Sequence, residues 1–573
     1  MHYKIFQKIP CSHYINVELN IKHYNENTLL LKLPRWRPGR YEMGNFSKNI
    51  RNFKAYDNTG NELLVTKINT FLWEIFNTKN TSVKITYEYY ANEYNAGACF
   101  ANEDILYINP VHLFMDIQLT EHTETVKYLI DIQVPKSYKT ISSLSKRGKY
   151  FVPKDFDELV DSPIVASPYI KSISYSVNDV KFFAHCIDVT EHYWDSKKIT
   201  QDFITLSKQV CAFWKSAPID KYHFIIHLLP QHYYHGVEHL KSTVIVLGPS
   251  KDIMTSLYSE LLGVSSHELF HAWNIKSIRP VQMQPYNYYT ENYSELGFVY
   301  EGFTTYYGDK LLWQSGLFSD AQFLDCINER LNRHYINDGK LSQSILDSSI
   351  DTWVDGYGIG APHKKVSIYD EGCLLALLMD LRIIEKSKYK KSLRDLCLFL
   401  YQDYVHDNKA YSINDIVNYY VELTKEDDID FFGKHIFKAV DLIPSLSLQL
   451  EKFGLKIYYT ESIHLWEKYF GFKVTEQSGK YFVTHILPSS PAYSQLSLND
   501  EILIVDNLTA KEFFTNNTLK NNILHLKVYR FGKVKDIAIN ASKQKSYYQK
   551  LSINKKDKVS ASEKKLFNLL QQL

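Results

Sequence analysis

The sequence has little that would tie it to nucleic acid or to a membrane. Its 573 residues carry 66 Lys and Arg against 64 Asp and Glu, a formal net charge of +2. Because there is neither an excess of positive charge nor a long basic run, no nucleic-acid partner is expected. The most apolar run, from Cys373 to Met379, stops at Asp380. That is far short of the roughly 20 residues of a membrane span, so no membrane span is expected either.

Cysteine is also scarce, and its spacing argues against two kinds of cysteine-based structure. The seven cysteines are odd in number and widely spaced, and no two form a Cys-x-x-Cys pair. Neither a thiolate zinc site nor a disulfide framework is therefore indicated. The first ten residues lack the apolar stretch of a signal peptide. We expect a cytoplasmic protein, and a periplasmic or exported location stays open if a leader has been removed.

The length and composition are those of a multidomain globular protein. At roughly 100–200 residues per domain, the chain is expected to hold about three or four domains. Hydrophobic residues make up 45% and charged residues 23%, which excludes wholesale disorder and allows a large core. Aromatic residues reach 14% and are spread along the chain, so we interpret them as compositional bias rather than as a binding surface.

Short alternating runs separated by turn residues fill the first part of the chain. The runs at 28–33 (TLLLKL) and 82–90 (SVKITYEYY) are typical of strands, and 57–60 (DNTG) marks a turn. We expect residues 1–175 to form an N-terminal β-rich domain, a β-sandwich.

Longer helical periodicities then fill residues 176–450, and short strands return in residues 451–545. The helices expected are 199–213, 253–275, 301–313, 321–335, 371–384 and 391–404, with strands at 222–229 and 242–247. The strands expected in the second β-rich module are 454–459, 472–475, 481–487, 501–505 and 524–529. Residues 546–573 are expected to be a tethered or partly disordered tail with a terminal helix. The predicted fold class is multidomain α+β.

One segment carries the signature of a metal site, the run from His267 to His271 (HELFH). On a helix, residues four apart share a face, so both imidazoles can reach one ion while Glu268 lies beside them. The alternative is a pair of surface histidines. Two neutral imidazoles and a carboxylate suit Zn²⁺ and leave a fourth position for water. Glu268 would then accept a proton from that water as general base.

The third ligand is less certain from the sequence than the two histidines. Glu301 lies 30 residues after His271 and opens a second helix-like segment, 301–308 (EGFTTYYG). Glu291 and Glu295 compete with it, but both lie in polar, loop-like sequence. The alternative for Glu301 is an acid that satisfies free amides at a helix N-terminus.

Several motifs together resemble one enzyme family. They are 33–41 (LPRWRPGRY), 236–239 (GVEH) with Ser242 and Thr243, 267–274 (HELFHAWN), 279–280 (RP), 301–304 (EGFT) with Tyr306 and Tyr307, and 369–372 (YDEG). The chain resembles the glycyl aminopeptidase family of zinc metallopeptidases over nearly its whole length. The resemblance implies an N-terminal β-rich domain, a mostly helical thermolysin-like catalytic domain at 176–450 and a PDZ domain. It also favours Glu301 as the third ligand of one zinc ion per chain.

The resemblance implies roles for four further residues. Glu238, with Gly236 and His239, would bind substrate by pairing with its free amine, although a solvated loop acid is the alternative. Tyr369 would donate its phenol to the oxyanion of the reaction intermediate, although a packing role is the alternative. The lysine common in the family two residues later is Glu371 here, which puts the local charge in doubt.

The second β-rich module resembles a PDZ domain over 465–540. Residues 469–472 (YFGF) stand where a carboxylate-binding loop would lie. Such a groove captures the C-terminus of a peptide by strand addition. The alternative is that the module only packs against the catalytic domain.

The function predicted is that of a zinc aminopeptidase acting on peptides with a free N-terminus. Family resemblance suggests small N-terminal residues, Gly or Ala. Two alternatives stay open: a zinc endopeptidase, and an inactive scaffold that binds peptides through its PDZ domain. Intact ligands and base favour an enzyme.

Overall fold

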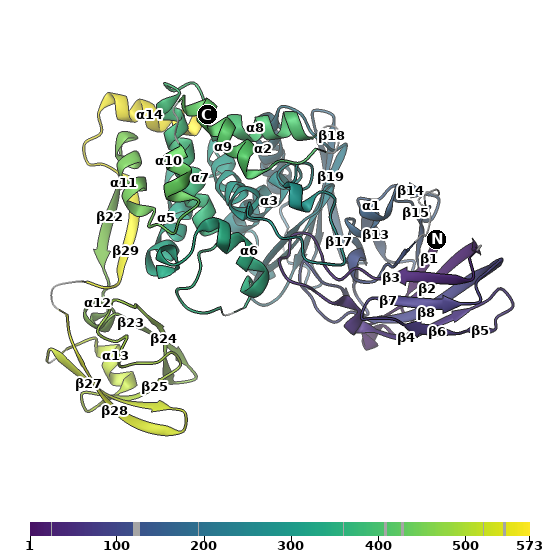
Figure 1. The fold of residues 1–573 in the computed structure, drawn as a ribbon, viewed down its shortest axis with the longest axis horizontal. Helices are drawn as coiled ribbons and strands as arrows, with labels where there is room; N and C mark the ends of the chain where they lie inside the picture. The colour runs from purple at the N-terminus through teal and green to yellow at the C-terminus, as the bar shows by residue number, and fades with distance from the viewer. Residues whose placement is uncertain are drawn as a thin grey trace.

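The computed structural model describes residues 1–24, 26–118, 126–192, 194–358, 360–405, 409–425, 429–519, 521–542 and 546–573. A β-rich domain lies at one side of the molecule, a helical region lies in the middle, and a smaller module lies at the far side (Figure 1). The fold is therefore multidomain α+β, with the β-rich N-terminal domain and helical middle region that the sequence predicted. Within the described ranges, no helix is both long and apolar enough to cross a membrane.

The N-terminal domain packs three sheets around one core. One sheet has eight strands in the order β14-β15-β12-β1-β2-β8-β4-β5, and two have four, β13-β16-β10-β9 and β11-β3-β7-β6. In β8, Val83, Ile85 and Tyr87 are buried, and the residues between them are less so, which is the period-two pattern of a strand. The elements are β1 (His2–Phe6), β2 (Tyr14–Tyr24), β3 (Thr28–Lys32), β4 (Ile50–Tyr56), β5 (Glu62–Leu63), β6 (Val65–Lys67), β7 (Leu72–Phe76), β8 (Thr81–Tyr90), β9 (Phe100–Ala101), β10 (Leu106–Ile108), β11 (Asp116–Ile117), β12 (Leu129–Ile132), β13 (Lys139–Ser142), β14 (Lys146–Arg147), β15 (Tyr150–Phe151), α1 (Phe156–Val160) and β16 (Ile164–Ser167).

A separate five-stranded sheet supports the central region. Its strands are β17 (Ile170–Val177), β18 (Val180–Ile187), β19 (Lys221–Leu228), β20 (Tyr233–Glu238) and β21 (Ser242–Gly248), in the order β17-β18-β19-β21-β20. Strand β20 is antiparallel to β21 and forms one edge. The domain boundary expected at residue 175 falls inside β17, and both β17 and β18 belong to this five-stranded sheet rather than to the N-terminal domain. An alternating sequence pattern predicts a strand but does not tell which sheet the strand joins.

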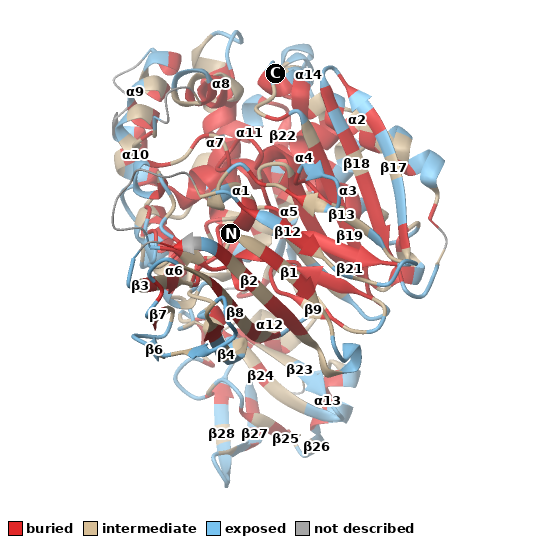
Figure 2. Cartoon of the chain, turned by 90° about the vertical axis from the view of Figure 1, so that its right-hand side faces the viewer, coloured by how far each residue is buried: buried red, intermediate tan, exposed pale blue. Residues whose placement is uncertain are grey.

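Helices build the rest of the central region. They are α2 (Ser196–Trp214), α3 (Tyr258–Phe270), the π-helix η6 (Phe298–Phe303), α4 (Thr304–Gln314), α5 (Asp320–Ile336), α6 (Ile345–Asp355), α7 (Asp370–Lys386), α8 (Leu393–Tyr404), α9 (Ile413–Thr424), α10 (Ile429–His435) and α11 (Ile443–Lys452). Short 3₁₀ turns lie at Pro10–Ser12, Phe46–Asn49, Pro110–His112, Ser250–Asp252, Val281–Met283 and Asp338–Leu341. Helix α7 is buried nearly all round, as Figure 2 shows, and this is why its sequence holds the most apolar run of the chain.

The helix expected at 253–275 is shorter in the structure, where α3 ends at Phe270. Two polar side chains beyond that end are buried against other segments. Asn274 donates hydrogen bonds to η6 and α4, and the ammonium of Lys276 pairs with Asp161. Ile275 between them has a φ of 99°, which no helix allows. These tertiary contacts outweigh the local helical pattern.

The C-terminal module has its own sheet and core. Its sheet runs β23-β24-β25-β27-β28, with β26 beside β25, and Trp466, Phe470 and Phe513 lie in its core. The elements are α12 (Leu465–Phe470), β23 (Phe472–Gln477), β24 (Lys480–Ile486), β25 (Glu501–Val505), β26 (Leu508–Thr509), α13 (Ala510–Asn516), β27 (Ile523–Arg530) and β28 (Lys533–Asn540).

This module is an insertion in the helical domain rather than a domain that follows it. Strand β22 (Leu455–Glu461) precedes the module, and β29 (Gln549–Lys555) follows it; the two strands pair antiparallel. Helix α14 (Ala561–Gln572) then returns to the helical domain, where the ring centroids of Phe567 and Trp313 lie 5.4 Å apart. The buried side chains of β22, β29 and α14 belong to the helical domain's core. The structure therefore differs from the expected division at residue 450. The terminal helix expected within 546–573 is present as α14, and it packs on the helical domain.

Candidate metal centre and active site

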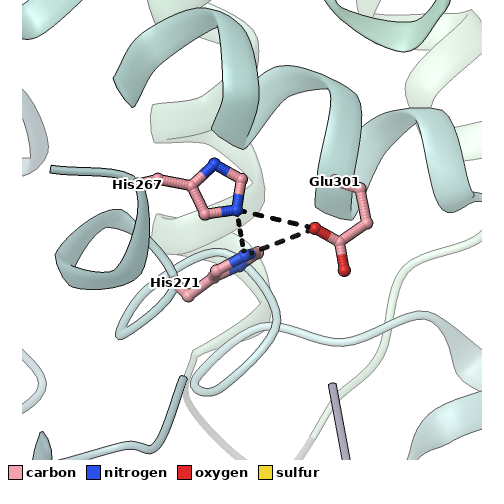
Figure 3. A group of neighbouring side chains, drawn as sticks. All are labelled: His267, His271 and Glu301. Atoms are coloured by element: carbon pink, nitrogen blue, oxygen red, sulfur yellow. Dashed lines mark hydrogen bonds and ion pairs between the residues drawn. The ribbon is translucent and has the colours of Figure 1, made fainter. Parts of the chain in front are cut away.

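Three potential metal ligands meet between α3 and η6 (Figure 3). His267 lies in the last turn of α3, His271 follows directly after it, and Glu301 lies on η6. The Nε2 atoms of the two histidines are 3.0 Å apart. The Oε2 atom of Glu301 lies 3.8 Å from Nε2 of His267 and 3.4 Å from Nε2 of His271. Within the described part of the chain, this is the group of three acidic, His or Cys side chains that fits an ion.

The spacing and donor set fit a tetrahedral zinc ion. Ligands at about 2.0–2.1 Å from such an ion lie about 3.3–3.4 Å from one another, within the observed range. His271 Nδ1 is 2.9 Å from the carbonyl oxygen of Asn274. A carbonyl only accepts, so Nδ1 carries a hydrogen and Nε2 is the nitrogen that can bind a metal after it loses its proton.

Hydrogen bonds hold the two ligand-bearing segments together. The Ser266 hydroxyl on α3 donates to the carbonyl oxygen of Gly308 on α4, at 2.7 Å. The Asn274 amide donates to the carbonyl oxygen of Val299 at 2.9 Å and to the Thr304 hydroxyl at 3.0 Å. All these groups are buried, so each unmade bond would cost about 1–3 kcal/mol. This explains why the serine before the first histidine and the Asn after the second accompany the motif.

A contact between two glycines places Tyr369 beside Glu301. A Cβ atom on Gly302 of η6 would lie 2.4 Å from the Cα of Gly372 on α7. Only hydrogen side chains allow such an approach of two backbones. Tyr369 stands at the start of α7, and Glu301 precedes Gly302, so the contact brings both into one site.

Glu268 is buried between the metal ligands and strand β20. Its side chain is 5% exposed, and a Cβ atom on Gly236 would lie 2.2 Å from its Oε1. Its Oε2 has no hydrogen-bond partner in the described structure. Burial, and then the nearby carboxylates of Glu238 and Glu301, raise the pKa of Glu268 well above its usual range. Such a carboxyl group is suited to accept and return a proton.

The two histidines differ in charge in the metal-free protein. Burial lowers the pKa of His267 well below its ordinary value, and the charge of His271 lowers it further. Burial acts in the same direction on His271, but the charge and hydrogen bond of Glu301 outweigh it and raise its pKa to about 9. Metal binding at this site therefore displaces a proton from His271.

The Tyr369 phenol is a hydrogen-bond donor over the whole ordinary pH range. Burial, followed by the charges of Glu301 and then Tyr357, raises its pKa well above the usual value for tyrosine. Glu371, whose charge was in doubt, is buried and paired with His334, with Oε2 and Nδ1 2.5 Å apart. That ion pair accounts for the carboxylate two residues after Tyr369.

The Glu238 carboxylate ends strand β20 and is 6% exposed. Its charge acts on Glu268, His271 and Tyr369, so it belongs to the same site. The following residue is turned elsewhere: Nδ1 of His239 lies 3.1 Å from Oδ1 of Asp161.

Asp161 also binds two other groups near that turn. It accepts from the backbone N–H of Leu240 at 2.8 Å and pairs with the Lys276 ammonium at 2.7 Å. Burial alone would raise the pKa of Asp161, but Lys276 and His239 hold it well below its usual value. These contacts favour a supporting role for His239, and its expected role in substrate binding stays a prediction.

Two site residues were not predicted from the sequence. The Tyr41 hydroxyl, from the N-terminal domain, donates to Oε1 of Glu301 at 2.6 Å. Tyr357 lies beside Tyr369, and its hydroxyl accepts from the backbone N–H of Tyr41 at 3.2 Å. The only available signal was the motif at 33–41, which ends at Tyr41. The competing ligands stay outside the metal group, since Glu291 is exposed and Glu295 is half-buried.

Comparisons with known proteins agree with this architecture. The profile of the peptidase M61 N-terminal domain matches residues 2–168, and that of the M61 glycyl aminopeptidase matches residues 260–375. An aminopeptidase N family protein from Idiomarina loihiensis has a similar structure, with a TM-score of 0.89 and 22% identity over 100% of this chain and 99% of that one. The similarity of fold to that protein therefore covers the whole chain.

More distant structures are M1 zinc metallopeptidases from Deinococcus radiodurans. One has a TM-score of 0.44 and 13% identity over 74% of this chain and 90% of that one. A mutant bound to a Tyr-Ser-Ala substrate has a TM-score of 0.44 and 13% identity, covering 78% and 93% of the two chains. No curated protein sequence matches the chain significantly. From the two profile matches, which cover both the N-terminal domain and the segment with all three candidate ligands, the chain belongs to the M61 glycyl aminopeptidase family.

Proposed function

We propose that this protein is a zinc-dependent aminopeptidase that removes N-terminal residues from peptides. The observation that carries the proposal is the grouping of His267, His271 and Glu301 with two further buried carboxylates, Glu268 and Glu238. The two histidines and Glu301 supply the metal ligands, Glu268 supplies a base, and Glu238 supplies a partner for the substrate amine. Membership of a peptidase family supports the same reading.

In this proposal, each residue has a defined task. Zinc held by the three ligands would polarise the scissile carbonyl and lower the pKa of the attacking water. Glu268 accepts the proton of that water and returns it to the leaving amine. Tyr369 donates its phenol hydrogen to the negative charge that develops on the carbonyl oxygen.

Glu238 sets the direction of attack. A substrate ammonium paired with this buried carboxylate would place the first peptide carbonyl at the metal centre. A charge-assisted bond of this kind contributes about 1.5–3 kcal/mol, or roughly tenfold to over a hundredfold in affinity. An acetylated N-terminus lacks the charge and leaves Glu238 buried without its partner.

The test compares free and N-acetylated versions of the same short peptides. We expect the free peptides to be cleaved one residue at a time and the acetylated ones hardly at all. Glu238→Ala should lower kcat/KM on free peptides and narrow this difference, whereas the control Glu291→Ala, at an exposed acid outside the site, should not. Cleavage of free and acetylated peptides at the same internal bonds would instead identify an endopeptidase.

The inactive-scaffold alternative is tested by Glu268→Gln. An amide cannot accept the proton of the attacking water, so this variant should keep zinc and lose turnover. If the wild type binds zinc but has no turnover on any free peptide, the scaffold reading is favoured.

For the residue removed, we propose a small one, Gly or Ala; the name of the family supports Gly. Peptides that differ only in an N-terminal Gly, Ala, Leu or Phe test this. A higher kcat/KM for Leu or Phe than for Gly and Ala would contradict it.

We further propose that the inserted module is PDZ-like. Strand β23 forms one edge of its sheet, and a peptide can add as a strand to such an edge. Contacts with the helical domain favour the packing role as well: Nε2 of His363 is 3.1 Å from the carbonyl oxygen of Ile486. Titration with peptides that have a free or amidated C-terminus separates a binding module from a packing module.

A further inference from the structure

A short segment of the N-terminal domain, residues 37–41, reaches the metal centre of the helical domain. Its last residue, Tyr41, is 3% exposed, and its hydroxyl lies 2.6 Å from Oε1 of Glu301. The other carboxylate oxygen, Oε2, is the one that lies 3.4 Å and 3.8 Å from the two histidine Nε2 atoms. The two oxygens of Glu301 therefore have different neighbours.

We propose that Tyr41 is a positioning residue for the metal ligand Glu301, supplied by the N-terminal domain. By occupying Oε1, its phenol turns Oε2 towards the histidines and makes Glu301 a ligand through one oxygen. Partners of this kind fix the orientation of a ligand and strengthen metal binding. The inference rests on the proposed metal site and adds the N-terminal domain to it.

Tyr41 is itself held firmly enough for this task. Its backbone N–H donates to the Tyr357 hydroxyl at 3.2 Å. Its ring packs against those of Tyr300 and Trp353, with centroids 5.7 Å and 6.0 Å away. The preceding carbonyl, of Arg40, accepts a hydrogen bond from the indole of Trp36. The phenol therefore has little freedom to leave Glu301.

The same segment also touches the second functional carboxylate. Gly39 has a φ of +81°, and a Cβ atom there would lie 2.3 Å from both carboxylate oxygens of Glu238. The backbone of Gly39 thus packs closely against one side of the Glu238 carboxylate, while Tyr41 binds Glu301. One turn of the N-terminal domain contacts both acids, so the domain forms part of the site's wall.

The test measures zinc affinity by competition with a chelating dye, independently of turnover. Tyr41→Phe removes only the hydroxyl and should weaken zinc binding about 10–100-fold, the usual loss for such a partner. Tyr300→Phe is the matched control, because Tyr300 is also buried and lies next to Glu301 in the sequence, and its hydroxyl has no partner in the described structure. The zinc affinity of Tyr300→Phe should stay within about threefold of the wild type, since this variant loses no hydrogen bond to a metal ligand. The absorption spectrum of the cobalt-substituted protein should change for Tyr41→Phe alone.

Three outcomes separate this inference from the proposed function. Wild-type protein that binds no zinc would refute the metal site itself. Wild-type binding with an unchanged affinity in Tyr41→Phe would overturn the role of Tyr41 and leave the site standing. If Tyr41→Phe also destabilises the metal-free protein, the comparison is repeated with Glu301→Ala present in both, because alanine leaves no oxygen for Tyr41 to bind. There Tyr41→Phe should no longer change zinc affinity, and a remaining tenfold loss, the lower end of the range above, would overturn the proposal.

Discussion

The glycine contact between η6 and α7 gives the sharpest prediction about how the site is assembled. In Gly302→Ala, the new methyl group would lie 2.4 Å and 2.5 Å from two backbone atoms of Gly372. Backbone atoms cannot rotate away as a side chain can, so the two helices must separate. Overpacking of this kind costs about 1–3 kcal/mol. The better helix propensity of alanine returns about 0.5–1 kcal/mol, so at the middle of both ranges the net loss of stability is about 1 kcal/mol.

Separation of the two helices also moves Glu301 away from Tyr369. We therefore expect Gly302→Ala to lower the midpoint of thermal unfolding by no more than about 4 °C, since about 1 kcal/mol shifts a domain of about 150–250 residues by about 2–4 °C and a larger one by less. Zinc affinity and kcat should fall as well, because the proposed ligand Glu301 and the proposed oxyanion donor Tyr369 are displaced together. Unfolding is followed by calorimetry and zinc affinity by chelator competition.

The control is Gly263→Ala in α3, the helix that carries His267. A Cβ atom on Gly263 meets no other atom within 4 Å. This variant should be more stable than the wild type by up to about 1 kcal/mol, through helix propensity alone. If Gly302→Ala unfolds at or above the wild-type temperature and binds zinc equally well, the added methyl group does not force the two helices apart and the reasoning fails.

Three other predictions concern catalysis, pH and the inserted module. Tyr369→Phe should lower kcat about 10²–10³-fold with little change in KM, and a change of no more than about twofold would make Tyr369 a packing residue. Burial lowers the pKa of His334, but Glu371 and Asp441 outweigh it and raise it to about 9. The stabilisation that His334 gains from Glu371 and Asp441 is thus fully present below the unfolded pKa of about 6.5, and it is lost as the pH rises through about 9. His334→Asn should make the midpoint of thermal unfolding depend less on pH across that range. An unchanged dependence on pH would show that His334 is not the group that titrates. Replacing residues 463–547 by a short turn should preserve zinc binding, because β22 and β29 pair up to Glu461 and Gln549, whereas truncation after residue 450 should prevent folding. A folded deletion variant without zinc would show that the module completes the site.

The parts of the site that depend on local spacing were predictable from the sequence. Two histidines four residues apart on a helix must share a face, and the structure brings their Nε2 atoms within 3.0 Å. Glu301 is the more distant candidate ligand, and the residues alone did not separate it from Glu291 and Glu295. The resemblance singled it out, and the structure groups it with the two histidines.

Contacts between distant segments could not be predicted in the same way. Tyr41 lies 260 residues before Glu301, and with 44 tyrosines in the chain nothing local distinguishes it. Strand β29 was missed for a similar reason, since its partner β22 lies before the whole module. The Lys- and Ser-rich sequence around β29 suggested a loose tail, although Leu551 and Ile553 are fully buried in the helical domain's core.

The insertion of the module also determines the order in which the enzyme can be completed during synthesis. The N-terminal domain with Tyr41, and both ligand-bearing segments, leave the ribosome before the module does. Strand β29 and helix α14, which close the core around Trp313, leave it afterwards. At about 5–20 residues per second, the roughly 85 residues of the module delay that closure by about 4–17 s. During this interval the apolar surface around Trp313 is exposed to the cell, while the small module can fold first on its own core.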